Sequence, residues 1–434
     1  MSPATITLLI LLLALILFVT ERIPLAVTAI LVDVLLVFTG VLPAKDAFSG
    51  LSNSTVVLFA ATFVIGAALF RTGVAKLIGD TVIKGAGKSE LRLLLAVMIV
   101  AGGLSAVLSN TGTTAVLLPI VMAIAASAGL SNKRLLMPLA YATSLGGMLT
   151  LVGTPPNVIA KATLDQAKLA SFGFFEYAKI GIPMAIIGTI YMLTLGKKLL
   201  STGDAAEVED VAKASAAQLE SEGLSQETSG RGKADVIRMW ISGLVLLAAV
   251  VVMAWGKYPL EVVAVTGALI VVITGCLKIE EAYKAIDWTT IFLFAGMLPM
   301  SKALEKTGAG KMIAEAVIGV MGSNPSPYLI TAVLFILACG LTNFMSNTAT
   351  AALLCPIGLA IAQGLGADPR AVVMAIAVGC SCAFMTPVGT PPNTIVLGPA
   401  RYRFTDYVIV GAPLTLLTFI VAVILLPLLW PFYH

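Results

Sequence analysis

The pentapeptide GTPPN occurs twice in this chain, at 153–157 and at 389–393, and each copy follows an SNT tripeptide, at 109–111 and at 346–348. The two GTPPN copies are 236 residues apart and the two SNT copies 237. Shorter matches between the two halves lie at an offset of 235. A pentapeptide that recurs in register with several other matches is very unlikely to arise by chance. The second half of the chain is therefore a repeat of the first.

The composition around these motifs is typical of a membrane protein. Of 434 residues, 59% are hydrophobic and 12% are charged, and the mean hydropathy is +1.01. Soluble domains carry roughly 25% charged residues. The net charge of +4 is scattered, without the basic stripe that nucleic-acid binding needs. The five cysteines lie in apolar segments without metal-ligand spacing, which indicates core packing. We predict an integral membrane protein in contact with lipid, with no nucleic-acid partner.

The apolar stretches predict an all-α membrane fold. A helix needs about 20 apolar residues to span a bilayer, and most stretches have about that length. Two of them, 92–129 and 327–365, are almost twice as long and carry a polar break at the middle. We interpret each as a re-entrant hairpin that returns to its own side. The sequence thus predicts about ten transmembrane helices plus two hairpins, from stretches near 5–20, 24–42, 54–70, 92–129, 135–166, 178–199, 236–256, 258–277, 288–304, 327–365, 370–400 and 406–430.

A polar segment at 201–235, rich in Ser, Gly and acids, divides the chain near its centre. We interpret it as a linker between a first repeat, 1–200, and a second, 236–434. Each repeat has an odd number of crossings, so the second is inverted relative to the first. With the amino terminus outside, about two thirds of the 27 Lys and Arg residues lie inside. This orientation predicts a cytoplasmic linker and a multi-pass protein of the cell membrane, the inner membrane in a bacterium.

The chemistry is expected at the two kinds of break. Non-helical backbone is tolerated at membrane depth only where it lines a cavity or is buried in protein. In GTPPN, the glycine can close one helix and the proline can start the next. Each break then presents carbonyl groups, which attract cations, and amide groups, which attract anions. The pairing of hairpin tips and GTPPN loops predicts a combined cation and anion site near the midplane.

The residues around the hairpin tips supply neutral oxygens. Ser105 and Thr342 each stand four residues before an SNT serine, and so lie one helical turn away on the same face. No carboxylate accompanies either cluster, whereas divalent hard cations normally require carboxylates. A monovalent cation, by default sodium, is favoured. Proton coupling would need a titratable group at the site, and the only histidine is the last residue. The side chains that supply neutral oxygens at the two tips are Ser105, Ser109, Asn110, Thr342, Ser346 and Asn347.

Two acidic residues, Asp33 and Glu261, fall furthest within apolar segments. A charged residue is costly to place inside a membrane, so an acidic residue in a membrane segment is a candidate functional residue. At an offset of 235, Asp33 aligns with Ala268 and Glu261 with Ala26, so neither belongs to the duplicated machinery. Asp33 has either a coupling role or a passive one, as a hydrogen-bonded or protonated buried group. Glu261 is expected near a helix end.

Several longer segments resemble the paired signatures of the divalent-anion/sodium symporters, a family that includes dicarboxylate, citrate and sulfate carriers. They are VLSNTGTTAVLLPI, LVGTPPN, NFMSNTATAALLCPI and AFMTPVGTPPN, together with FVTERIP at 18–24. The resemblance covers essentially 18–430, although the chain lacks one amino-terminal helix of the usual pattern. It implies a homodimer in which a transport part moves past a fixed scaffold, as an elevator does. The scaffold would comprise 5–70 and 236–304, and the transport part 92–199 and 327–430.

The resemblance also implies individual ligands, position by position. One sodium (Na+) site would be formed by Ser105, Ser109, Asn110 and Gly153. The other would be formed by Thr342, Asn347 and Gly389, with the backbone carbonyl of Met345. The anion would be held by Asn110, Thr111, Ser346, Asn347, Thr348, Thr390 and Pro391.

We therefore expect a secondary transporter that couples sodium to the symport of a small divalent anion, such as succinate, citrate or sulfate. A sodium-independent anion exchanger is the first alternative, and basic side chains at the tips would favour it. The tips contain none. A proton-coupled carrier is the second alternative. An enzyme would need catalytic groups or metal ligands at the midplane, and the sequence offers none there.

Overall fold

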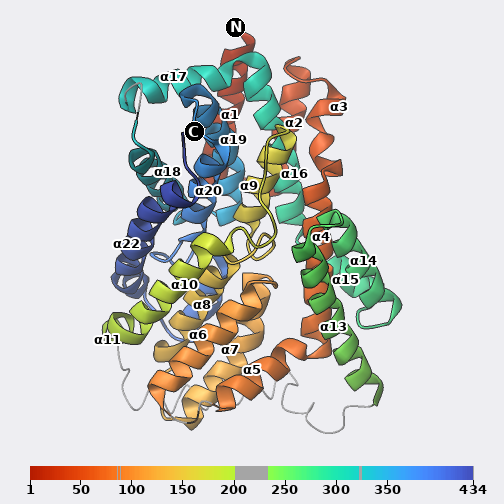
Figure 1. Ribbon diagram of the computed structural model, residues 1–434, viewed down its shortest axis with the longest axis vertical. Helices are drawn as coiled ribbons and strands as arrows, with labels where there is room; N and C mark the ends of the chain where they lie inside the picture. Colours follow the sequence, from red (N-terminus) through yellow and green to blue (C-terminus); the bar gives the residue numbers. More distant parts are fainter. Residues whose placement is uncertain (86, 88, 201–232, 322–324, 434) are drawn as a thin grey trace.

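The computed structural model describes all residues except 86, 88, 201–232, 322–324 and 434 (Figure 1). The described residues form helices, turns and loops without a strand, as the sequence predicts. Most of the 201–235 linker lies outside the described residues. Seven described helices are long and apolar enough to cross a membrane, and shorter apolar helices accompany them, at Leu25–Phe38, Leu260–Ile273, Pro327–Thr342 and Pro369–Ser381.

The first repeat begins with uninterrupted helices and continues with the interrupted ones. Its elements are α1 (Pro3–Thr20), α2 (Leu25–Phe38), α3 (Ala44–Ala47), the 3₁₀ turn η1 (Ser49–Ser52), α4 (Ser54–Thr72), α5 (Val74–Gly85), α6 (Glu90–Ser105), α7 (Asn110–Ser127), α8 (Lys133–Gly147), α9 (Pro155–Gln166), α10 (Ala178–Tyr191), the π-helical turn η2 (Met192–Gly196) and α11 (Lys197–Leu199).

The second repeat has the same order of elements. They are α13 (Lys233–Trp255), α14 (Leu260–Ile273), α15 (Ile279–Ala285), α16 (Trp288–Thr307), α17 (Ala309–Met321), α18 (Pro327–Thr342), α19 (Asn347–Leu365), α20 (Pro369–Ser381), α21 (Pro391–Leu397) and α22 (Phe404–Leu429). In Figure 1, α4 descends through the molecule while its counterpart α16 ascends. The two repeats are therefore inverted, as the odd number of crossings predicts.

Each hairpin breaks at its SNT motif. Helix α6 ends at Ser105 and α7 begins at Asn110, while α18 ends at Thr342 and α19 begins at Asn347. The serine of each motif is the N-cap: Ser109 Oγ accepts a hydrogen bond from Gly112 N at 3.1 Å, and Ser346 Oγ accepts one from Ala349 N at 3.2 Å. A serine that caps the returning helix explains why the chain can reverse there.

The GTPPN breaks are longer than the motif itself. Each proline does start a helix, α9 at Pro155 and α21 at Pro391. The preceding helices, however, end at Gly147 and Ser381, well before the motif glycines. The expectation that the motif glycine closes a helix is thus wrong. A stretch of irregular backbone stands between the half-helices, because side chains and neighbouring backbone provide its hydrogen bonds.

Two connecting helices were not expected from the sequence. Helices α5 and α17 lie across the lower and upper ends of the molecule and join the uninterrupted helices to the hairpins (Figure 1). They have 12 and 13 residues. A search for apolar spans of about 20 residues misses such helices, because they are amphipathic and too short to cross a bilayer.

Glycines allow neighbouring helices to approach closely. A Cβ atom placed on Gly146 in α8 would lie 2.2 Å from the carbonyl oxygen of Gly102 in α6. Helix α16 packs on α2 in the same manner, with Gly296 against the backbone of Ala29. Helices in membranes usually associate through small residues, which let their backbones pack closely. The hydrophobic effect contributes little to this association, because a helix surface is as apolar in contact with lipid as in contact with another helix.

We predict that Gly146→Ala lowers the free energy of unfolding by about 1–3 kcal/mol, because the added methyl group forces α6 and α8 apart. Gly103→Ala is the matched control, since a Cβ there meets nothing within 4 Å. Thermal unfolding of the purified variants measures the difference. Equal melting temperatures for the two variants would contradict the close contact.

Candidate functional site

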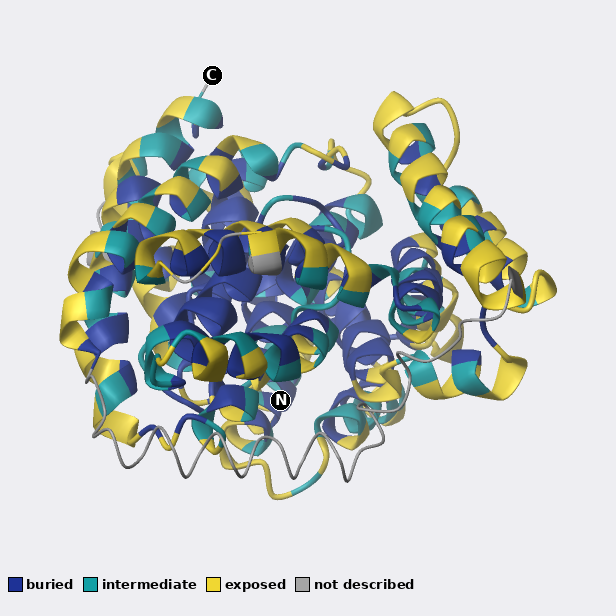
Figure 2. Cartoon of the chain, turned by 90° about the horizontal axis from the view of Figure 1, so that it is seen from below, coloured by how far each residue is buried: buried dark blue, intermediate teal, exposed yellow. Residues whose placement is uncertain are grey.

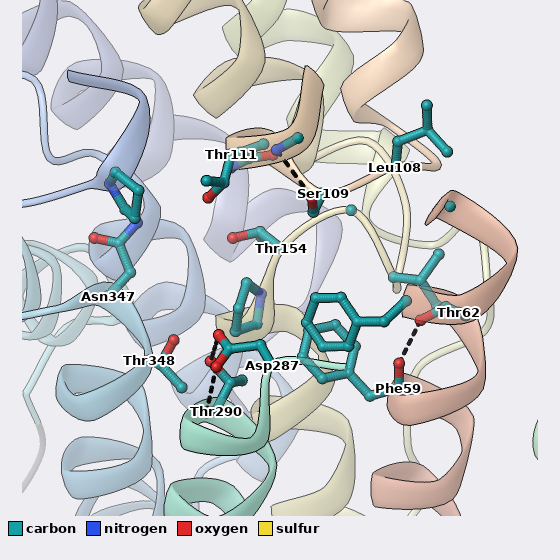
Figure 3. Close-up of a pocket in the computed structure, with 18 of the residues that line it drawn as sticks. Phe59, Thr62, Leu108, Ser109, Thr111, Thr154, Asp287, Thr290, Asn347 and Thr348 are labelled. Carbon is teal, nitrogen blue, oxygen red and sulfur yellow. Dashed lines mark hydrogen bonds between the residues drawn. The ribbon is translucent and has the colours of Figure 1, made fainter. Parts of the chain in front are cut away.

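A cavity of about 450 Å³ lies where the hairpin tips, the GTPPN breaks and the uninterrupted helices α4 and α16 meet (Figure 3). All residues expected to hold the anion line it: Asn110, Thr111, Ser346, Asn347, Thr348, Thr390 and Pro391. Of the other residues expected to bind sodium, Ser109 and Gly153 also line the cavity. Ser105, Thr342, Met345 and Gly389 lie buried behind its wall.

Helix amino termini converge on this cavity. Helices α7, α9, α19 and the short α21 all begin with residues that line it. The first amide groups of a helix lack partners within the helix and carry the positive end of its dipole. The described lining contains no Lys, Arg or His side chain. Its attraction for an anion therefore comes from backbone amides, hydroxyl groups and side-chain amides.

The first hairpin tip holds a cluster of oxygens around Asn110. Ser105 Oγ lies 2.5 Å from Asn110 Oδ1. The carbonyl oxygens of Thr143 and Gly153 lie 3.1 Å from the same end of the amide. These groups come from α6, α7, α8 and the GTPPN break, so the cluster joins the hairpin to the interrupted helix beside it.

The second tip repeats this arrangement around Asn347. Thr342 Oγ1 lies 2.7 Å from Asn347 Oδ1 and 2.9 Å from Cys380 O, either of which can accept its proton. The carbonyl oxygens of Gly389 and Cys380 lie 2.9 and 3.1 Å from the same end of the amide. The two clusters are therefore equivalent, one in each repeat.

Sequence reasoning missed the carbonyl groups of Thr143 and Cys380. These residues are 237 positions apart, the spacing of the SNT copies. The repeat offset relates them, but their contribution comes from the backbone. No side-chain type could have marked them.

An amide at the centre of each cluster can serve it in two ways. Its nitrogen can donate to the surrounding hydroxyl and carbonyl oxygens, or its oxygen can join them as another cation ligand. Which end faces the cluster is set by the hydrogen-bond partners or ion present. The oxygens named are neutral, and the described residues contain no group of His, Cys, Asp or Glu that could hold a metal. Such a cage suits a monovalent cation.

The asparagine of each GTPPN motif holds the irregular backbone in place. Asn157 Nδ2 donates to Thr150 O at 2.8 Å and to Gly147 O at 3.3 Å. Asn393 Nδ2 donates to Ala383 O and Thr386 O, both at 2.9 Å. These bonds satisfy carbonyl groups that no helix can satisfy.

Two tyrosines anchor the same asparagines from the following helices. Tyr177 and Tyr407 each donate a hydrogen bond of 2.7 Å, to the backbone oxygens of Asn157 and Asn393. Both tyrosines are fully buried. The breaks are therefore fixed from two directions, and the carbonyl groups of Gly153 and Gly389 are held beside the oxygen clusters.

Two further lining residues were not expected. Thr154, the repeat counterpart of Thr390, is 1% exposed, and its hydroxyl has no hydrogen-bond partner within the described structure. The repeat offset of 236 could have found it. Asp287 lines the opposite wall, immediately before α16. It lies outside every repeated motif, so no sequence signal marked it.

The two membrane acids lie elsewhere. Asp33 in α2 is 1% exposed, and neither of its carboxyl oxygens has a hydrogen-bond partner among the described residues. It does not line the cavity. Of its two passive alternatives, a protonated buried group fits this environment, since an unpaired buried charge is costly. Glu261 lies in the first turn of α14, as expected, and lines a second cavity of about 370 Å³ with Lys161 and Asp165.

Comparison with known proteins agrees with this architecture. The family described as citrate transporter matches residues 15–377 and 344–433, which together span most of the chain. The chain belongs to this citrate transporter family. It is therefore a multi-pass membrane transporter and not an enzyme, which confirms those parts of the sequence prediction.

Other members and a solved fold extend the comparison. The uncharacterized transporter YfbS of Escherichia coli is 28% identical, over 96% of this chain and 98% of its own. The sodium-dependent dicarboxylate transporter SdcS of Staphylococcus saprophyticus is 26% identical, over 95% of this chain and 84% of its own. The structure of Neisseria gonorrhoeae MtrF, described among antimetabolite efflux pumps, shares the fold, with a TM-score of 0.60, 15% identity and coverage of 98% and 94%.

We predict that Asn393→Ala lowers the free energy of unfolding by about 1–3 kcal/mol, since it leaves the carbonyl groups of Ala383 and Thr386 without partners. Thr394→Ala should have a much smaller effect, because this neighbouring position is exposed and, among the described residues, its hydroxyl contacts only the carbonyl oxygens of Pro387, at 2.7 Å, and Thr390, at 3.5 Å. Thermal unfolding measures both. An unchanged stability in Asn393→Ala would show that the break does not depend on this tether.

Proposed function

We propose that this transporter carries a small divalent anion together with sodium ions. One observation supports this proposal. Two equivalent clusters of neutral oxygens lie on either side of one cavity, and helix amino termini line the cavity between them. A dianion in this cavity meets no basic side chain in the described lining. Cations bound in the two clusters would offset its charge.

The proposal assigns one sodium ion to each cluster. One ion would take Ser105 Oγ, Asn110 Oδ1 and the carbonyl oxygens of Thr143 and Gly153. The other would take Thr342 Oγ1, Asn347 Oδ1 and the carbonyl oxygens of Cys380 and Gly389. Because each asparagine stands at a helix amino terminus that also lines the cavity, an ion that fixes its side chain would also order the anion site.

The anion would lie between the tips. The hydroxyl and amide groups of Thr111, Thr348 and Thr390 and of the two tip asparagines would hold its oxygens, and Thr154 adds a hydroxyl without a partner. The name of the Staphylococcus relative, a sodium-dependent dicarboxylate transporter, makes a dicarboxylate such as succinate the first substrate to test. Citrate and sulfate follow.

The proposed movement is that of an elevator. Ligands for ions and anion come from the hairpins and the interrupted helices, whereas α2, α4, α14 and α16 are uninterrupted. Two inverted copies can exchange conformations, which gives an inward and an outward state. A fixed scaffold would be held by a second copy of the chain. The outer faces of α13 and α14 are rich in exposed apolar side chains, which suit lipid or a partner: Ile237, Trp240, Leu244, Leu247, Val251, Val262, Leu269 and Ile273.

Uptake into proteoliposomes tests the coupling. We expect labelled succinate, citrate or sulfate to accumulate with an inward sodium gradient and not with choline in its place. A sodium-independent uptake that requires an anion inside the vesicles would favour exchange. Uptake driven by a proton gradient alone would favour a proton-coupled carrier.

Two substitutions connect that uptake to the clusters. Asn110→Ala and Asn347→Ala should each abolish sodium-dependent uptake, because each removes an oxygen and two donors at the site. Asn132→Ala is a matched control, since this buried asparagine lies outside the cavity and donates to Pro399 O. Near-normal uptake by either tip variant would show that the tip is structural only.

A crosslink tests the movement. Thr55 in α4 donates a hydrogen bond of 3.3 Å to Asp165 Oδ2 in α9, which joins the proposed scaffold to the transport part. In a background without the five natural cysteines, oxidation of a chain with Thr55→Cys and Asp165→Cys should stop transport and leave anion binding intact. Reduction should restore transport.

The matched control joins two helices of the transport part. Arg134 in α8 and Glu90 in α6 form an ion pair of 3.1 Å. A disulfide between cysteines at these two positions should leave transport running. If the crosslink between α4 and α9 also left it running, a local gate would have to replace the elevator.

A further inference from the structure

The wall of the cavity opposite the tips is apolar except for Thr62 in α4, whose hydroxyl donates to Phe59 O at 2.8 Å, and the residues near the start of α16. Phe59, Phe63 and Phe70 from α4 and Leu293 from α16 form most of it. Asp287 is the charged side chain among the described lining residues (Figure 3). A cavity whose opposite wall consists of helix amino termini thus has one formal negative charge facing it.

Asp287 is held in place by the helix that it precedes. Its Oδ1 accepts a hydrogen bond from Thr290 N at 3.1 Å, and its Oδ2 accepts one from Thr290 Oγ1 at 2.5 Å. Both are bonds to neutral donors, so they orient the carboxylate without cancelling its charge. The residue is exposed.

The other charged residues near this point do not line the cavity. Glu281 in α15 pairs with Arg71 at 3.2 Å, and Glu280 and Lys284 lie on the same short helix outside the lining set. Among the described lining residues, Asp287 is therefore the ionised side chain that contributes to the field inside the cavity.

We propose that Asp287 determines the charge preference of this cavity: it concentrates sodium beside the tips and opposes a dianion that arrives without sodium. The inference rests on the proposed sodium-coupled function. Asp287 belongs to the uninterrupted helices, so it would not travel with the ions and the anion. It acts only while the tips face this wall, where it promotes cation binding first and favours release of the anion.

The expected effect of Asp287 on a binding constant depends on the charge of the ligand. A fixed charge changes the binding energy of each ligand in proportion to the ligand's own charge. In water, two unit charges on the order of 10 Å apart interact strongly enough to change an equilibrium constant about twofold. Removal of the Asp287 charge should thus weaken sodium binding about twofold and tighten binding of a dianion about fourfold. The two effects have opposite signs, and added salt should reduce both.

Asp287→Asn is the appropriate variant, because asparagine caps a helix as well as aspartate does. Calorimetric titration of purified protein, at constant ionic strength, should give a sodium dissociation constant that rises and a succinate dissociation constant, at saturating sodium, that falls. Glu280→Gln removes the same charge outside the lining set, and should shift both constants less than Asp287→Asn does. Asp287→Ser, which also keeps a cap, should reproduce the asparagine result.

Each outcome decides between the two proposals. If the unsubstituted protein bound succinate equally well in sodium and in choline, the proposed function would fail, and this inference with it. If sodium dependence were present but Asp287→Asn shifted both constants in the same direction, or neither, only the role of Asp287 would be refuted. A shift of equal size in Glu280→Gln would also refute it, since the effect would then be one of net charge.

Discussion

The backbone of this protein stops being helical at four points inside its membrane-spanning core, and each polar group freed there needs a partner. The tethers of Asn157 and Asn393 satisfy several carbonyl groups. The carbonyl groups of Thr143, Gly153, Cys380 and Gly389 instead face a side-chain amide and a hydroxyl. Lipid cannot satisfy such groups. The same constraint therefore explains why the breaks are buried, why they are held so rigidly, and why they can serve as cation ligands.

Burial varies widely among the helices and does not follow the division into interrupted and uninterrupted helices alone, since 56% of the apolar window of the uninterrupted α4 is buried but 44% of that of α7. In α19, 78% of the apolar window is buried inside the molecule, whereas in Ala234–Trp255 only 22% is. Seen from below, the outer helices expose much of their surface and the central ones are enclosed (Figure 2). Helices that hold interrupted backbone must be surrounded by protein, while uninterrupted helices can face lipid because their hydrogen bonds are internal.

The two repeats are equivalent in their clusters and tethers but not in their surroundings. Asn110 and Asn347 have matching partners, and so do Tyr177 and Tyr407. Asp287 has Ser52 at the matching position, and Asp33 has Ala268. Symmetry is kept where both conformations of an elevator would need the same ligands. Symmetry is lost in the uninterrupted helices, which the ligands would face first on one side of the membrane and then on the other. There a difference in charge between the repeats would make the two sides bind the ligands differently.

The sequence alone determined the membrane class, the inverted duplication, the hairpins, and the SNT residues and several GTPPN residues that line the cavity, because each depends on local patterns: apolar length and a repeated motif. It did not reveal α5 and α17, which are too short and amphipathic for a search based on spans. Nor did it reveal the helix ends at Gly147 and Ser381, which precede the motif glycines by 6 and 8 residues. Only the tertiary structure brought Asp287 to the cavity and the carbonyl groups of Thr143 and Cys380 to the clusters. Backbone carbonyl groups have no sequence signature, and a carboxylate gains its role from the wall that it faces.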